Sequence, residues 1–278
     1  MYTLSNERNT QNELLSQADD YVDKIMRKTK HVLPYAARFC LVSTFVEDGL
    51  RMCFQWGQQR DYMASLWNMP KFLGTLFVIV NMVFQLVPSC MVLVKKNTLQ
   101  ASLILLVMAI FQMLAYNIFW DIRMALRILA LVGGLLLLLV EETKASLSIY
   151  TGIPTSPKGE QSTNALQLVG RILLIFMFAS ILHFRNSLYL ICIDIFGTAM
   201  MTLVTIGFKT KLCSTVLFFY LGLINVIMNP FWTARIGSPF HDILRYDFFQ
   251  TLSVMGGLLY VVMLGPGGVS IDARKKQW

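Results

Sequence analysis

The chain has 278 residues, of which 55% are hydrophobic and only 14% charged, and its net charge is +8. A soluble domain of this size needs far more charged surface, so the composition excludes one and predicts a chain surrounded mostly by lipid. The positive charge does not indicate nucleic-acid binding, because the basic residues are scattered among short connectors rather than gathered on one face.

The first 31 residues are polar and contain no signal peptide, so we expect the first spanning helix to direct insertion. Apolar residues in this segment fall near helical spacing, with basic residues around them. They are Leu15, Ala18, Val22, Ile25 and Met26. The pattern predicts a short amphipathic helix over part of residues 1–31, lying on the cytosolic face of a membrane.

Eight apolar runs follow, each close to the 20 or so residues that a helix needs to cross a bilayer. They lie at residues 33–53, 72–94, 98–119, 124–140, 166–184, 188–207, 212–232 and 243–264. We therefore predict an all-α, polytopic bundle of about eight transmembrane helices, in which the first and last are polar enough to be marginal.

The connectors between these runs differ in basic charge. With a cytosolic N-terminus, 14 lysines and arginines fall on the cytosolic side and six on the other. Cytosolic connectors are enriched in such residues, so this count predicts that both ends of the chain lie in the cytosol.

Two similar sets of residues predict an internal repeat. Arg38 opens the first predicted span and Arg171 the fifth, while Gly133-Gly134 in the fourth span matches Gly256-Gly257 in the eighth. We expect two parallel four-helix repeats, over residues 32–140 and 166–264. A cytosolic loop, 141–165, would join them, and a cytosolic tail, 265–278, would follow. Chance similarity between helices rich in leucine and glycine is the alternative.

Acidic residues gather in the half predicted to face away from the cytosol. A charge inside a bilayer costs about 2.5–3.5 kcal/mol, so such groups are expected to face water or one another. We expect either an acidic cavity or rim that binds a cationic ligand, or ion pairs that fix helix register. Glu47 with Arg51 and Asp242 with Arg245 have the spacing of such pairs. The candidate binding residues are Glu47, Asp48, Asp61, Asp242 and Asp247.

The sequence carries no recognisable catalytic motif, so we expect neither an enzyme nor a cofactor or metal site. Arg38 and Arg171 lie just inside the predicted cytosolic boundary. We expect their side chains to snorkel to the lipid headgroups, and pairing of Arg38 with Glu141 or Glu142 is the alternative.

The chain ends Lys275-Lys276-Gln277-Trp278. Two lysines at these places resemble the dilysine signal that the COPI coat reads on membrane proteins of the endoplasmic reticulum. Such a signal must be exposed to the cytosol, where the basic residues also place this tail.

Several segments together resemble the surfeit locus protein four family of endoplasmic reticulum cargo receptors. They are residues 46–52, 54–62, 207–212, 241–251 and 265–270, followed by the dilysine tail. The resemblance implies a receptor that selects soluble secretory proteins in the lumen and enters COPII vesicles. It would cycle through the intermediate compartment and early Golgi and return by COPI.

Two further classes remain open. The repeat and the ending also resemble DoxX-like membrane proteins, some of which are linked to quinone redox chemistry. A transporter or lipid scramblase could also use a polar cavity within the membrane.

Overall fold

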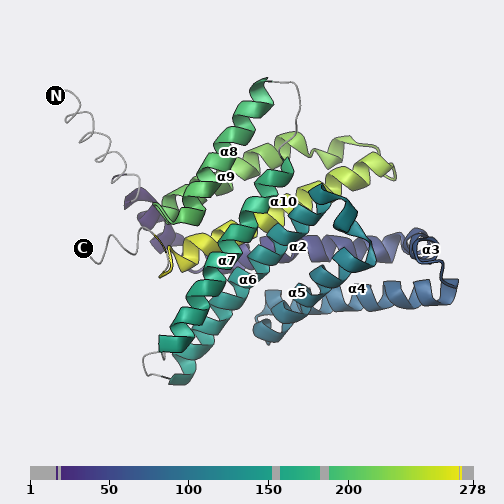
Figure 1. Cartoon of the computed structure of the whole chain (residues 1–278), viewed down its shortest axis with the longest axis horizontal. Helices are drawn as coiled ribbons and strands as arrows, with labels where there is room; N and C mark the ends of the chain where they lie inside the picture. The colour runs from purple at the N-terminus through teal and green to yellow at the C-terminus, as the bar shows by residue number, and fades with distance from the viewer. Residues whose placement is uncertain (1–16, 18–19, 152–156, 182–187, 269, 271–278) are drawn as a thin grey trace.

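The computed structural model describes residues 17, 20–151, 157–181, 188–268 and 270. Throughout these residues the ordered elements are helices, as predicted (Figure 1). The long helices are α2 (Leu33–Phe54), α4 (Lys71–Val94), α5 (Thr98–Ala115), α6 (Ile122–Thr151), α7 (Pro157–Ile181), α8 (Leu188–Ile206), α9 (Thr210–Met228) and α10 (Pro239–Leu264). The short ones are α3 (Trp56–Leu66), η1 (Ile118–Trp120) and η2 (Phe231–Thr233).

Each long helix overlaps one of the eight predicted apolar runs, and the structure is that of an all-helical, polytopic membrane protein. Helices α6 and α7 extend beyond their runs into the predicted loop 141–165, which is helical at 141–151 and 157–165. Five of them, α4, α5, α6, α9 and α10, are long and apolar enough in their described residues to cross a bilayer. Helix α2 carries four charged side chains, at Arg38, Glu47, Asp48 and Arg51. The number of spans therefore stays a prediction.

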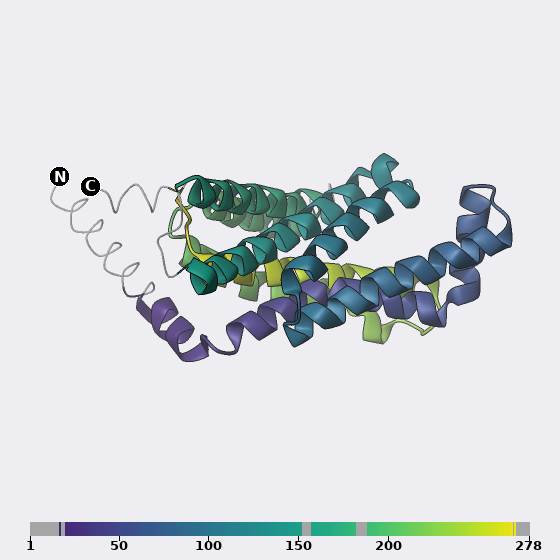
Figure 2. The same ribbon diagram turned by 90° about the horizontal axis from the view of Figure 1, so that it is seen from below.

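The bundle is elongated (Figures 1 and 2). The helix over residues 20–29 lies at one end and α3 at the other. Helix α3 falls in a segment that the sequence predicts only as a connector. We refer below to these two ends as the basic end and the α3 end.

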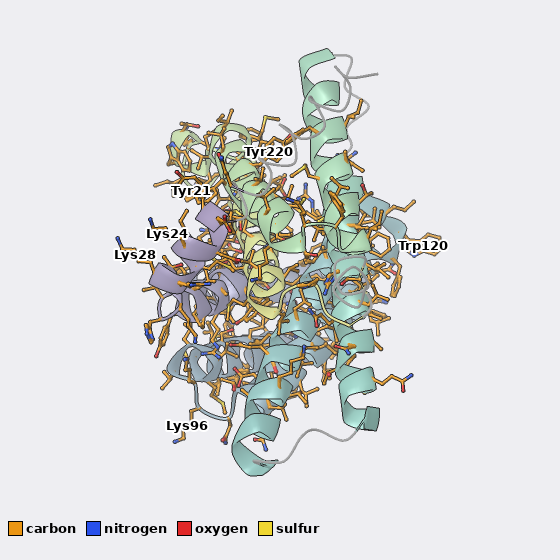
Figure 3. The ribbon with its side chains drawn as sticks, turned by 90° about the vertical axis from the view of Figure 1, so that its left-hand side faces the viewer. Tyr21, Lys24, Lys28, Lys96, Trp120 and Tyr220 are labelled. Atoms are coloured by element: carbon orange, nitrogen blue, oxygen red, sulfur yellow. The ribbon has the colours of Figure 1, made fainter. Side chains whose placement is uncertain are left out.

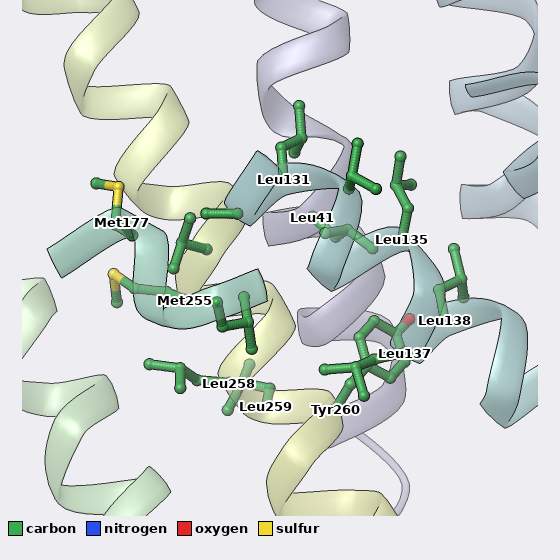
Figure 4. Close-up of a cluster of buried hydrophobic side chains, with 14 of the residues drawn as sticks. Leu41, Leu131, Leu135, Leu137, Leu138, Met177, Met255, Leu258, Leu259 and Tyr260 are labelled. Carbon is green, nitrogen blue, oxygen red and sulfur yellow. The ribbon is translucent and has the colours of Figure 1, made fainter. Parts of the chain in front are cut away.

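The core is built around α6 and α10, whose most extensive contacts are with α7 and α2 respectively. Figure 4 shows leucines of α6 converging with Leu41 of α2 and with Leu258 and Tyr260 of α10. Lipid tails are as apolar as these side chains, so hydrophobicity alone does not hold the helices together. Close packing of the side chains stabilises the core instead.

Glycines allow this packing. A Cβ atom added at Gly256 on α10 would lie 2.5 Å from the backbone nitrogen of Leu41 on α2, and one at Gly133 would lie 2.7 Å from the carbonyl oxygen of Gly170 on α7. Between these two contacts, Gly134 and Gly257 face each other across α6 and α10. We call Gly133, Gly134, Gly256 and Gly257 the glycine seam.

The two arginines predicted to snorkel are instead buried, so that prediction is wrong. The guanidinium of Arg38 bonds to Glu142 at 2.6 Å and to Glu141 at 3.3 Å, which is the alternative pairing. Arg171 donates to the carbonyl oxygen of Gly265 at 3.0 Å and also to that of Pro266. Arg38 finds its carboxylates and Arg171 its carbonyl oxygens inside the protein. Neither side chain therefore extends to the lipid headgroups.

These contacts correspond between the two halves of the chain. In each half, an arginine on the first helix binds groups in or after the C-terminal half of the fourth: Glu141 and Glu142 within α6, and the carbonyls of Gly265 and Pro266 directly after α10. The division into two four-helix repeats stays a prediction, which this correspondence and the glycine seam support.

Candidate functional site

A cavity of about 610 Å³ opens toward the α3 end, between α2, α3, α5, α6 and α10. Four of these helices line it with residues three or four apart, which is the spacing of one helix face. The lining positions are 44, 45, 48 and 51 on α2, 109 and 112 on α5 with 116 directly after it, 124, 128 and 131 on α6, and 242, 243, 246, 247 and 250 on α10. Helix α3 adds Gln58, Gln59 and Tyr62.

Asp48 in the wall of this cavity is held from three sides. Its Oδ2 atom accepts hydrogen bonds from Gln85 at 2.9 Å and Gln112 at 2.7 Å, and its Oδ1 atom pairs with Arg51. The amides come from α4 and α5, so this one carboxylate joins three helices. A buried carboxylate is tolerated when its lone pairs are satisfied in this way.

Two ion pairs tie α10 to the rest of the bundle. Arg245 donates from Nε to Glu47 on α2 at 2.9 Å, and Asp247 pairs with Arg127 on α6. The Glu47–Arg51 distance is longer, 3.9 Å, so the pair predicted within α2 is weaker than the one between helices. These carboxylates therefore act at least in part as braces that set helix register, which was one of the two expectations.

Asp242 lies nearer the mouth and is about a quarter exposed. It accepts a hydrogen bond from Gln55 at 2.9 Å, with His241 and Arg245 at 3.4 and 3.8 Å. Since it lines the cavity and is partly exposed, it keeps surface open to a ligand.

Asp61 lies elsewhere. It stands on α3 with 54% of its side chain exposed, outside the cavity lining, and pairs with Arg60 at 2.9 Å. That hydrogen bond holds the pKa of the Asp61 carboxyl below its ordinary value, so it is ionised at neutral pH.

The structure thus brings Asp48, Asp242 and Asp247 together in one wall, with Glu47 buried behind them. Among the charged lining residues are four aspartates, including Asp121, and one arginine, Arg51, so the lining is acidic. Lys275 and Lys276 lie outside the described residues.

Neutral polar residues make up a part of the site that the sequence did not reveal. Gln112, Tyr116, Tyr246 and Gln250 line the cavity alongside the carboxylates. Charge was the signal used to predict the site, and an uncharged amide or phenol in an apolar helix resembles an ordinary packing residue. For Tyr246 and Gln250, the signal that would have found them is their spacing from Asp242 and Asp247 on α10. Helix α5 carries no acidic residue, so no such signal marks Gln112.

Nothing in the described part of the chain brings three or more His, Cys, Asp or Glu side chains into a group that could hold a metal ion. The fold and the site together define a helical membrane protein with an acidic pocket at one end of its bundle.

The chain belongs to the SURF4 family, whose model matches residues 12–278. It is 44% identical over 267 residues to the surfeit locus protein 4 homologue of Drosophila melanogaster, covering 96% of this chain and 98% of that one. It is 34% identical to the homologue of Schizosaccharomyces pombe, covering 99% and 92%. The family resemblance expected from the sequence is confirmed.

A third relative is the ER-derived vesicles protein ERV29 of Saccharomyces cerevisiae, which is 31% identical over 253 residues, covering 91% of this chain and 80% of that protein. No solved structure matches the chain.

Proposed function

We propose that this protein is an endoplasmic reticulum membrane receptor that binds soluble secretory proteins in the lumen and carries them into COPII vesicles bound for the Golgi. The observation that carries the proposal is the acidic cavity at the α3 end. The name of the yeast relative, which refers to vesicles derived from the endoplasmic reticulum, supports the compartment.

The distribution of basic residues supports a cavity that opens to the lumen. Lys24, Lys28 and Lys96 project from the basic end of the bundle, which faces the viewer in Figure 3. Lysines on that side favour its placement in the cytosol, so the α3 end faces the lumen. Both termini would then be cytosolic.

The acidic lining favours cationic ligands. A cavity with low-dielectric walls and carboxylates of one sign concentrates positive charge and raises the rate at which it arrives. A free amino terminus or a basic segment of a folded cargo protein has this charge. Asp48, Asp242 and Asp247 would face it, and Glu47 would act through Arg245. Asp61 would contribute only at the outer surface.

Asp242→Asn tests this role. Asparagine can still accept the hydrogen bond from Gln55, so the fold is retained while one negative charge is removed. We expect cargo affinity to fall by about 2 kcal/mol, or roughly 30-fold, if the carboxylate faces a charged ligand. The measurement is the secretion rate of a receptor-dependent cargo, normalised to receptor abundance.

Asp61→Asn is the matched control, because it removes the same charge outside the cavity. If secretion fell strongly in Asp61→Asn and stayed normal in Asp242→Asn, cargo would bind on the outer surface instead. Normal secretion in both variants and in Asp48→Asn and Asp247→Asn would make the carboxylates purely structural.

Return of the receptor would depend on COPI and the dilysine tail. We expect Lys275→Ala with Lys276→Ala to shift the steady-state protein from the endoplasmic reticulum to the Golgi, because the coat no longer recognises it. Fluorescence microscopy against markers of both compartments measures the shift. Replacing Arg274 with alanine removes a neighbouring charge and serves as a control. An unchanged distribution of the double variant would rule out this retrieval route.

A further inference from the structure

Gln250 has an unusual position in the cavity wall. It lies on α10 one turn after Tyr246 and Asp247, and its side chain is 0% exposed. Neither its Nε2 nor its Oε1 atom has a hydrogen-bond partner among the residues that the structure describes. A buried donor or acceptor without a partner destabilises the protein, and this side chain carries one of each.

Other buried amides of the bundle are at least partly used. Gln85 donates to Asp48, Asn81 to the carbonyl oxygen of Phe77, and Asn225 to that of Phe248. Within the described residues, Gln250 is the amide whose donor and acceptor both lack a partner. Gln250 therefore does not hold two helices together, as the neighbouring carboxylates do.

The exposed fraction shows that Gln250 lies at the closed end. Ile243, two turns earlier on α10, also lines the cavity and is 55% exposed, so α10 descends from the mouth to the floor. Phe45, Ala109 and Leu131 line the same cavity and are almost fully buried. The floor is thus largely apolar. Its polar groups are the Gln250 amide and the Thr44 hydroxyl, which already bonds to Ser253 and to the carbonyl oxygen of Phe249. The partly exposed carboxylates of Asp242 and Asp247 lie nearer the mouth.

We propose that the Gln250 carboxamide pairs with a backbone amide of a bound cargo peptide, and so determines which part of the ligand reaches the floor. An adjacent donor and acceptor match the N–H and C=O groups of an extended chain. A charged headgroup would be poorly solvated on an apolar floor, which favours a peptide over a lipid. Binding requires Gln250 to turn toward the cavity, and side-chain rotations of this kind are common at interfaces.

The inference rests on the proposed function, and a peptide-binding cycle tests it. The probe is a synthetic peptide from the N-terminal segment of a receptor-dependent cargo, with a set of variants that each carry one N-methylated backbone amide. Affinity for purified receptor is measured with the wild type, Gln250→Met and the control Asn81→Leu. Asn81 is also fully buried but lies outside the cavity lining.

We expect one N-methyl position to lower affinity for the wild type by about tenfold, since N-methylation removes one hydrogen bond to a buried acceptor. The same position should have little effect on Gln250→Met, which already lacks the acceptor, and its full effect on Asn81→Leu. If Gln250→Met is not recovered at wild-type level, Gln250→Asn takes its place in the cycle, because it withdraws the amide by one methylene.

The inference would be overturned if each N-methyl peptide lost the same affinity for the Gln250 variant as for the wild type. It would also be overturned if the Gln250 variant bound the unmethylated peptide as tightly as the wild type does. Either result leaves the proposed function intact. Failure of the wild type to bind any cargo peptide, or displacement of the peptide by phospholipid headgroups alone, would instead contradict the proposed function.

Discussion

Replacing Gly256 with valine is expected to prevent α2 and α10 from packing and to leave little folded receptor. The added Cβ would lie 2.5 Å from the backbone nitrogen of Leu41 and 2.8 Å from the carbonyl oxygen of Ala37. Backbone atoms within a helix cannot rotate away, so the two helices must separate. Overpacking of this kind costs about 3 kcal/mol. Receptor abundance and the thermal stability of the detergent-purified protein measure the effect.

Gly222 on α9 provides the matched control. A Cβ atom there would meet only the Cε atom of Met255 at 3.1 Å, the mobile end of a flexible side chain. Gly222→Ala should therefore be neutral or slightly stabilising, because alanine favours a helix by about 1 kcal/mol over glycine. Equal stability of Gly256→Val and wild type would contradict the close approach of α2 and α10.

Removing the carboxylate of Glu47 is expected to destabilise the receptor as strongly. Glu47→Leu leaves the Arg245 guanidinium, which bonds to Glu47 at 2.9 Å, without its main partner in a largely buried site. Breaking a buried pair from one side costs about 3 kcal/mol, or over 100-fold in the folding equilibrium. Thermal unfolding of the purified receptor, read beside its abundance in cells, measures the loss.

The double variant Glu47→Leu with Arg245→Met should recover much of that stability, because no unpaired charge remains. Asp23→Asn breaks the exposed pair between Asp23 and Lys211 and is expected to leave stability unchanged. If the double variant is less stable than Glu47→Leu, the two side chains do not act as a pair.

Helical periodicity and hydropathy predicted the fold well, because each long apolar run must satisfy its own backbone hydrogen bonds and does so as a helix. Helix α3 was missed because its mean composition is polar and a connector was sufficient to explain it. For Arg38, the sequence left pairing with Glu141 or Glu142 as the alternative to snorkelling, whereas the buried position of Arg171 was missed for a different reason. A sequence gives the depth of a residue along its helix but not which neighbouring helix supplies a partner.

The candidate site was predicted only in part, because a sequence gives the depth of its residues but not their partners on other helices. Asp48, Asp242 and Asp247 do line one cavity, and their grouping follows from a shared depth in the bundle. Spacing predicted Glu47 beside Arg51, whereas the shorter contact is to Arg245 on another helix. Gln250 shares a face of α10 with Asp247 but carries no charge, and that it is buried without a partner follows only from the packing of five helices around one space.

The glycine seam has a consequence for motion. Rocking one half of the chain against the other, as in many transporters, would have to part backbones that are in contact at Gly134 and Gly257. Helix α3, by contrast, packs mainly on α4 and only slightly on α2, yet it contributes Gln58, Gln59 and Tyr62 to the cavity lining. We therefore expect ligands to be admitted by displacement of α3 over a rigid four-helix wall, with the basic end staying closed throughout.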